Sequence, residues 1–263
     1  MIVLAAAAHP DDIEFMMAGT LLRLKDAGCD IHLWNLANGC CGSQDLSRQE
    51  TITCRWQEAQ ASAALAAGTC HPPLFEDLEI FYDKASVEKV AAVIREIQPD
   101  IILTHSPQDY MEDHQNAARL VVTGAFVRGM KNVRTDPGVA PYDKPVALYH
   151  ALPHGLQDGL RQKIAPDLFT DIGMVLARKR AMLACHASQK AWLDLTQGIN
   201  AYLDTMENMS REVGRMSEKF EFAEGWRQHS HLGFAAEHFN PIVDLFSRYP
   251  GTVKVNTYGA PDQ

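Results

Sequence analysis

Three side chains that could bind a metal or move a proton stand together near the N-terminus, in the segment His9-Pro10-Asp11-Asp12. An apolar run at residues 2–8 precedes them, and a helical pattern follows at once. Open α/β sheets place their ligand sites at the carboxyl edge of such strands. An imidazole and two carboxylates at this edge suit a divalent metal ion and an adjacent general base. Asp12 could instead cap the helix, but capping explains neither His9 nor the second carboxylate.

A second group of the same kind follows a predicted strand at residues 100–104. Because neighbouring parallel strands end at the same edge of a sheet, His114 can approach His9 and Asp12. Two imidazoles and one carboxylate make three protein ligands, the number typical of a catalytic zinc site that keeps one position for water. The same donors also suit iron(II). Two further carboxylates could orient the ligand imidazoles, namely Asp109 and Asp113.

Apolar runs alternate with helical patterns through the first half of the chain, which predicts a mainly parallel sheet with helices on both faces. No GxGxxG motif follows the first strand, which argues against a nucleotide-binding module. The absence of repeats favours a single domain over residues 1–263, with a C-terminal elaboration. The further predicted strands are 31–37, 145–152 and 168–172, with an extended segment at 220–226. The predicted helices are 12–27, 46–67, 86–97, 113–127, 174–188 and 192–217.

The composition is that of an acidic globular protein, with 263 residues, 46% hydrophobic side chains and a net charge of −9. This balance argues against a nucleic-acid or anionic-membrane partner. No run approaches the roughly 20 apolar residues that span a bilayer. The N-terminus lacks the basic region of a signal peptide, and the six cysteines form no CxxC pair. We therefore expect a cytoplasmic protein with reduced thiols.

Two adjacent cysteines, Cys40 and Cys41, could form a redox pair or a thiolate site. Side chains of neighbouring residues on an extended chain point to opposite sides. The sequence therefore favours two separate thiols. The surrounding segment NGCCGS follows a predicted strand, so it could approach a substrate or be an ordinary loop.

Four segments of this chain resemble the PIG-L/LmbE-like de-N-acetylase family in order and spacing, over nearly the whole length. They are AHPDDIE at 8–14, RWQE at 55–58, THSPQDYMEDH at 104–114 and FAEGW at 222–226. The resemblance implies a Rossmann-like α/β fold and a zinc-dependent hydrolase. Its substrate would be a small N-acetylated amino sugar or glycoconjugate. The resemblance also implies a homo-oligomer, since relatives commonly assemble through their C-terminal elements.

The same resemblance implies roles for individual residues. His9, Asp12 and His114 would bind the metal, and Asp11 would be the general base. Arg55 would point toward the substrate, although it could simply pair with Glu58 on the same helical face. Glu224 would contact a sugar hydroxyl, with structural support as the equal alternative.

The chain departs from the family at Met111, where many members have the first histidine of an HPDH motif. A thioether can neither donate a proton nor carry a positive charge. We hypothesise that His229 or His231 supplies the missing donor, since alternating residues on an extended chain share one side. Other functions also remain open: a metal-dependent amidase acting on a larger amide or thiol conjugate, or a non-catalytic binding protein on the same fold.

Overall fold

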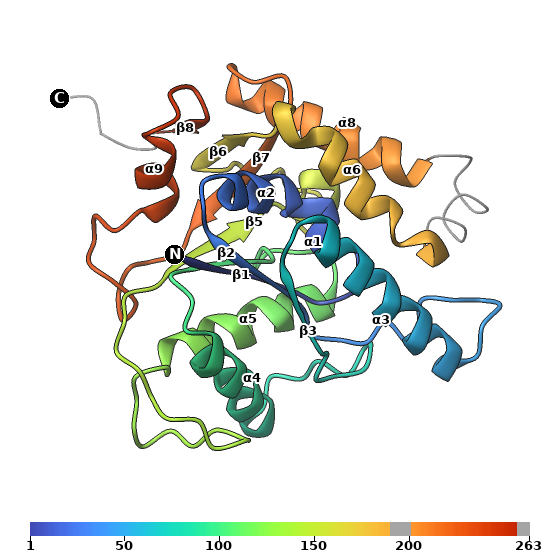
Figure 1. Cartoon of the computed structure of the whole chain (residues 1–263), viewed down its shortest axis with the longest axis vertical. Helices are drawn as coiled ribbons and strands as arrows, with labels where there is room; N and C mark the ends of the chain where they lie inside the picture. The colour runs from blue at the N-terminus through green and yellow to red at the C-terminus, as the bar shows by residue number, and fades with distance from the viewer. Residues whose placement is uncertain (190–200, 257–263) are drawn as a thin grey trace.

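A single sheet forms the centre of the molecule in the computed structural model, which describes residues 1–189 and 201–256 (Figure 1). Its strand order is β3-β2-β1-β4-β5-β7-β6-β8. The first five strands in this order pair in parallel, whereas β7, β6 and β8 add antiparallel pairs. The strands are β1 (Ile2–Ala7), β2 (Asp30–Asn35), β3 (Thr69–His71), β4 (Ile101–Thr104), β5 (Ala147–Ala151), β6 (Leu168–Asp171), β7 (Ala223–Gln228) and β8 (Val253–Val255).

Helices cover both faces of this sheet (Figure 1). Helices α4 and α5 lie on one face, where they pack against Leu4 and Ala6 of β1. Helices α1, α2, α3 and α6 lie on the other face, where Val3 and Ala5 point. The helices are α1 (Asp12–Met16), α2 (Ala18–Asp26), α3 (Arg48–Leu65), α4 (Lys84–Ile97), α5 (Glu112–Phe126), α6 (Leu176–Ala184), α8 (Ala201–Ser217) and α9 (Pro241–Phe246), with short 3-10 turns η1 (His154–Leu156) and η2 (Gly173–Val175).

The strand order creates a natural ligand site between β1 and β4. From β1 the chain crosses over to β2 on one side, while β4 continues the sheet on the other. Loops that leave the carboxyl ends of β1 and β4 therefore diverge and open a crevice at this switch point. Ala6 of β1 pairs with Thr104 of β4, so the segments that begin at His9 and His105 start side by side.

The predicted α/β fold is confirmed, with differences in several of its elements. The helix predicted at 12–27 is interrupted at Met17, whose φ of −132° separates α1 from α2. The helix predicted at 174–188 is shorter and begins as η2 before α6. Strands β3 and β8 and helix α9 were not predicted, because the strands have only three residues each and the helix only six. The start of the predicted helix 192–217 lies outside the described residues.

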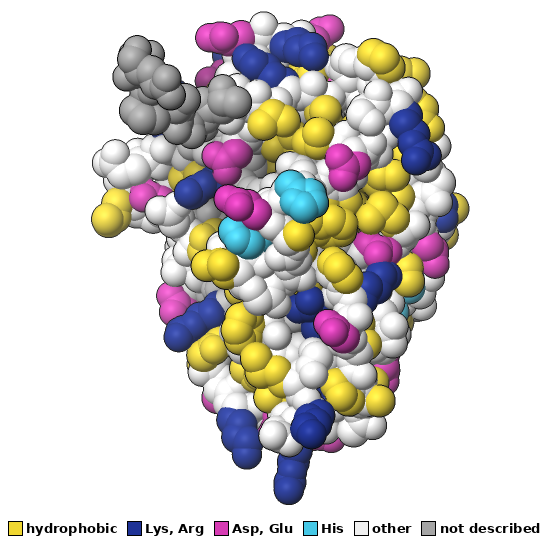
Figure 2. All heavy atoms as spheres, turned by 90° about the vertical axis from the view of Figure 1, so that its left-hand side faces the viewer, with side chains coloured by type: hydrophobic (Ala, Val, Ile, Leu, Met, Phe, Trp, Pro, Cys, Tyr) yellow, Lys and Arg dark blue, Asp and Glu magenta, His cyan; other side chains and the backbone are white. Residues whose placement is uncertain are grey.

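The surface carries charges of both signs. On the face shown in Figure 2, basic and acidic side chains are interspersed with apolar ones. Within the described residues, the structure contains no helix of the length and apolarity needed to cross a membrane.

Candidate active site

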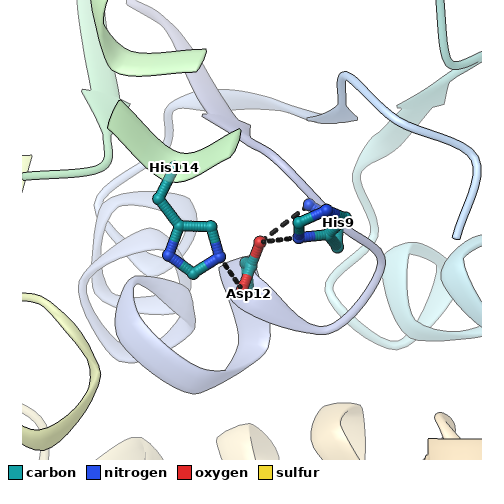
Figure 3. Close-up of side chains that lie close together, drawn as sticks. All are labelled: His9, Asp12 and His114. Atoms are coloured by element: carbon teal, nitrogen blue, oxygen red, sulfur yellow. Dashed lines mark hydrogen bonds and ion pairs between the residues drawn. The ribbon is translucent and has the colours of Figure 1, made fainter. Parts of the chain in front are cut away.

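The two loops after β1 and β4 bring His9, Asp12 and His114 together (Figure 3). Asp12 lies between the two imidazoles, with its Oδ2 3.5 Å from Nδ1 of His9 and its Oδ1 3.4 Å from Nε2 of His114. Nitrogen and oxygen ligands of a tetrahedral zinc ion are themselves about 3.4 Å apart. One ligand atom from each of the three residues lies within 4.8 Å of the others. The donor set and its spacing therefore match a zinc-type site.

Each imidazole of this cluster is held from behind by a second carboxylate. Nε2 of His9 donates to Oδ2 of Asp113 at 2.9 Å, and Nδ1 of His114 donates to Oδ1 of Asp109 at 3.1 Å. Both carboxylates are 2% exposed, so these bonds form away from water. The other ring nitrogen of each histidine faces Asp12, and in the neutral ring its lone pair is available to bind a metal ion.

The cluster concentrates opposite charges in a buried place. Burial would lower the pKa of His9, but the Asp113 and Asp12 carboxylates outweigh it and raise that pKa to about 9. Burial likewise opposes protonation of His114, yet Asp12 and Asp109 raise its pKa to about 10. Burial also disfavours the Asp12 carboxylate, but His114 and His105 hold its pKa well below the usual value. The cluster therefore attracts a cation, and a bound metal ion would take the place of the extra protons on His9 and His114.

Asp11 lies beside the metal-type cluster but does not belong to it. Its backbone is left-handed, with φ of 108°, and its side chain caps no helix. Oδ2 instead accepts a hydrogen bond from the Tyr202 hydroxyl at 2.7 Å, and Oδ1 lies 3.5 Å from the Arg55 guanidinium. Burial, opposed by Arg55 and assisted by the Asp12 charge, raises the pKa of Asp11. A carboxylate with a raised pKa is a better proton acceptor.

Arg55 is buried and fixed by the loops around it. Its guanidinium donates to the carbonyl oxygens of Pro10 and Gly39. The predicted alternative, a pair with Glu58, does not form, because Glu58 accepts from the backbone and hydroxyl of Ser188. Arg55 thus supports the loop that carries Asp11 and also lines the cavity.

A cavity of about 480 Å³ opens above the cluster. It exposes the three metal-type ligands together with Asp11, so all four groups face one space. His105 and Tyr110, which also line the cavity, stand within the segment 104–114 that the sequence had already indicated. Four further lining residues were missed by sequence reasoning, because each comes from a different part of the chain and none has a motif of its own: Phe15, Asp77, His154 and Tyr202.

His105 contributes a third imidazole next to the cluster. Its ring stacks on His114 with centroids 4.1 Å apart. Its Nε2 accepts a hydrogen bond from the Ala8 backbone at 2.9 Å, so the proton of the neutral ring sits on Nδ1. Burial, followed by the charge of His114, lowers the pKa of His105. His105 therefore packs as a neutral ring against the imidazole of His114.

Of the two roles predicted for Glu224, a contact with a sugar hydroxyl and structural support, its contacts favour the second, and it does not line the cavity. Its Oε1 accepts from Gly19 N at 2.8 Å and from Lys179 Nζ at 2.7 Å, and its Oε2 accepts from Thr20 N at 2.6 Å. The side chain is 4% exposed. Three of its roughly four lone-pair positions join β7 to α2 and α6. These contacts agree with the structural alternative for Glu224.

Comparison with known proteins agrees with this geometry. Residues 4–125 match the family model described as PIG-L, GlcNAc-PI de-N-acetylase. A diacetylchitobiose deacetylase of Thermococcus kodakarensis is 29% identical over 194 residues, which cover 71% of this chain and 69% of that protein. The solved N,N'-diacetylchitobiose deacetylase from Pyrococcus horikoshii has a TM-score of 0.74 at 21% identity, covering 92% of this chain and 88% of its own. Over residues 4–125 the chain is therefore similar to the PIG-L/LmbE-like family.

The proteins that this chain is similar to do not all carry one name. A 4-oxalmesaconate hydratase of Pseudomonas putida is 27% identical over 195 residues, which cover 71% of this chain and 73% of that protein. The similarity to it extends as far along the chain as the similarity to the deacetylase. Similarity to these proteins therefore leaves two candidate reactions, and only the residues of the site can favour one of them.

At the position where many PIG-L proteins have a histidine, Met111 lines the cavity. The proposed substitutes lie elsewhere: Nδ1 of His229 is 3.0 Å from Nε2 of His150, and neither His229 nor His231 lines the cavity. Tyr110, whose ring lies 5.7 Å from that of His114, and the neighbouring His154 both line the cavity and could donate a hydrogen bond instead. Partial burial, with the charges of Asp12 and Asp109, raises the pKa of Tyr110 to about 12, so its hydroxyl stays protonated at neutral pH.

Proposed function

We propose that this protein is a zinc-dependent hydrolase that removes the acetyl group from the nitrogen of an amino sugar or a small glycoconjugate. The observation that carries the proposal is the set His9, Asp12 and His114 in one cavity with an unligated carboxylate, Asp11, beside it. Three protein ligands leave a coordination position free, as hydrolytic zinc sites require. The donor set also suits iron(II), so the identity of the ion is part of the proposal.

A divalent ion held by these residues would act as a Lewis acid that activates water and polarises the amide carbonyl. The chain's own contribution is proton transfer and positioning. Asp11 accepts the proton of the attacking water on its carboxylate and returns it to the departing nitrogen. Such general acid–base help accelerates reactions by about 100- to 10,000-fold. The hydroxyl of Tyr202 and the guanidinium of Arg55 hold this carboxylate in place.

The remaining wall of the cavity suits a sugar ring. Aromatic side chains from three elements stand around it, with Phe15 5.0 Å from His154 and 5.5 Å from Tyr202 between ring centroids. A sugar ring has an apolar face and polar edges. Aromatic rings of the cavity can pack on that face, while hydroxyl and imidazole groups bind the polar edges. Tyr110 and His154 would donate hydrogen bonds to the carbonyl oxygen as negative charge develops on it.

Hydration of a carbon–carbon double bond is a second candidate, which the Pseudomonas putida relative and Met111 favour. That relative's name denotes a carboxylate substrate. Here the cavity wall already contains the carboxylates of Asp11, Asp12 and Asp77, and among the described lining residues Arg55 is the single Lys or Arg. Since Arg55 already contacts Asp11, the side chains add little positive charge for an anionic substrate beyond that of the metal ion itself. The electrostatics therefore support deacetylation of a neutral sugar.

The test is acetate release from N-acetylglucosamine and its oligosaccharides by purified, metal-loaded protein, before and after chelation. We expect turnover that chelation abolishes and zinc restores. Asp11→Asn should retain its metal and lose about 100-fold or more in kcat, whereas the surface variant Asp26→Asn should behave as the unmodified protein. Metal-loaded protein that releases no acetate but consumes an unsaturated carboxylate would establish the hydratase instead. Full turnover by Asp11→Asn would contradict the assignment of the base.

A further inference from the structure

Cys40 and Cys41 share one side of a tight turn, contrary to the expectation of separate thiols. Gly42 N donates to the carbonyl oxygen of Gly39 at 3.1 Å, which places both cysteines at the centre of a four-residue turn. Gly39 makes the turn possible with its φ of +77°. The chain is not extended here, so the alternation of side chains does not apply. The two sulfur atoms lie 3.8 Å apart.

This separation is that of two ligands on one metal ion. Two thiolates at about 2.3 Å from a tetrahedral zinc ion are themselves about 3.8 Å apart. It is nearly twice the roughly 2.05 Å of a disulfide. The turn therefore holds two reduced thiols at a sulfur–sulfur distance that suits binding of both to one metal ion.

Asp77 adds an oxygen donor to this pair. A carboxylate oxygen of Asp77 and the two sulfur atoms lie within 4.8 Å of one another. The carboxylate is anchored, because its oxygens accept from Gly39 N at 2.7 Å and from Cys41 N at 2.9 Å. Each oxygen keeps a free lone pair, and the exposed Cys41 side chain can turn to close the set. Thiolate donors select soft cations such as zinc and cadmium over magnesium or calcium.

We propose that Cys40, Cys41 and Asp77 form a second cation site, for a thiophilic divalent ion such as Zn2+ or Cd2+, in the wall of the same cavity. On binding, each S–H bond gives up its proton to solvent as a sulfur–metal bond forms, so one ion releases two protons. No electron is transferred. Burial, among other influences, raises the pKa of Cys40 to about 11, so binding should strengthen as the pH rises.

The position of the site connects it with the catalytic cavity. Cys41 and Asp77 both line that cavity. Leu78, the next residue, donates its backbone N–H to Asp113, the carboxylate behind His9. The loop also packs on Arg55, since a side chain at Gly42 would collide with that guanidinium. An ion on the dithiol would therefore narrow the cavity and lower turnover. This last consequence rests on the proposed function, whereas binding of the ion does not.

The experiment is a cadmium titration of protein whose histidine–aspartate cluster is already saturated with zinc, in a phosphine reductant that does not chelate. We expect one Cd2+ per chain, the near-ultraviolet absorption of cadmium–thiolate bonds, and release of two protons. The double variant Cys40→Ser/Cys41→Ser should lose the absorption and weaken cadmium binding by more than about 100-fold. Cys70→Ser, which removes a partly buried thiol from β3, should match the unmodified protein.

Two results would overturn the proposal: no cadmium–thiolate absorption in the unmodified protein, or the same absorption in the double serine variant. Because Cys41 is exposed, Cys41→Ser alone tests the site even if substitution of the buried Cys40 impairs folding. These readouts do not depend on catalysis, so failure of deacetylation would leave them unaffected. Where deacetylation is observed, excess cadmium should inhibit the unmodified protein and spare the Cys41→Ser variant.

Discussion

The carboxylate behind His9 offers the sharpest test of the metal site, because it can be altered in steps. Nε2 of His9 and the backbone N–H of Leu78 donate to the same oxygen of Asp113, Oδ2. In Asp113→Asn the amide oxygen can occupy that position, so both hydrogen bonds survive and only the negative charge is removed. In Asp113→Ala both hydrogen bonds are lost as well.

The expected magnitudes follow from this difference. Loss of a partner behind a metal-binding histidine typically weakens metal affinity by about 10- to 100-fold. We expect the Asn variant near the lower value, about 1.4 kcal/mol, and the Ala variant near the upper value, about 2.7 kcal/mol. Asp109→Asn should behave as Asp113→Asn does, because Met111 N and His114 Nδ1 also share one oxygen of Asp109.

The assay is competition for zinc between each variant and a chromogenic chelator at fixed pH. Asp26→Asn, which alters an exposed pair with Arg178, provides the control and should bind zinc as the unmodified protein does. If Asp113→Ala binds zinc with unchanged affinity, Asp113 does not orient His9 toward the ion. Equal losses in the Asn and Ala variants would show that charge alone matters and that the hydrogen bonds do not.

Three further predictions concern residues around the site. Tyr202→Phe removes a hydrogen bond to the Asp11 carboxylate, worth about 1.5–3 kcal/mol, so kcat for deacetylation should fall about 10- to 100-fold at unchanged zinc content; an unchanged kcat would contradict the positioning role. Glu224→Gln leaves Lys179 buried without its charge partner, which costs about 3–5 kcal/mol, so calorimetry should show a melting temperature roughly 5–10 °C lower, with zinc binding intact. Burial lowers the pKa of His150 to about 4, so the stability due to its neutral form is complete above the unfolded value near 6.5 and is lost as the pH falls toward 4. The difference in urea-unfolding free energy between the unmodified protein and His150→Asn should therefore shrink by about 2.5 kcal/mol from pH 7.5 to pH 4.5, and a difference that stays constant would show that His150 does not titrate in this way.

The sequence predicted the metal-type cluster because its ligands follow strands directly. His9 and Asp12 come immediately after β1, and His114 lies within ten residues of the end of β4. Parallel neighbours deliver such residues to one edge whatever the detailed loop geometry. The local sequence pattern and the strand order were sufficient to predict that His9, Asp12 and His114 come together.

Residues whose role depends on distant packing could not be predicted. Tyr202 lies 191 positions from Asp11, on a helix where a tyrosine of the apolar face resembles any core residue. Glu224 stands in a motif that indicates function, yet Lys179 and two backbone amides of α2 take up its carboxylate. The role of Glu224 is set by the packing of α2 and α6 next to β7, and the residues of the motif give no indication of that packing.

The two adjacent aspartates show the same limit on a smaller scale. Sequence chemistry asks for one metal ligand and one free base, but the residue type is identical at positions 11 and 12. The backbone separates them: Asp12 begins α1 and directs its carboxylate between the two imidazoles, whereas Asp11 has a φ of 108° and turns toward Tyr202 and Arg55. A left-handed aspartate has an energetic cost that the surrounding contacts must offset. In the proposed mechanism, the separate roles of ligand and base therefore depend on contacts that α3 and α8 make with Asp11 through Arg55 and Tyr202.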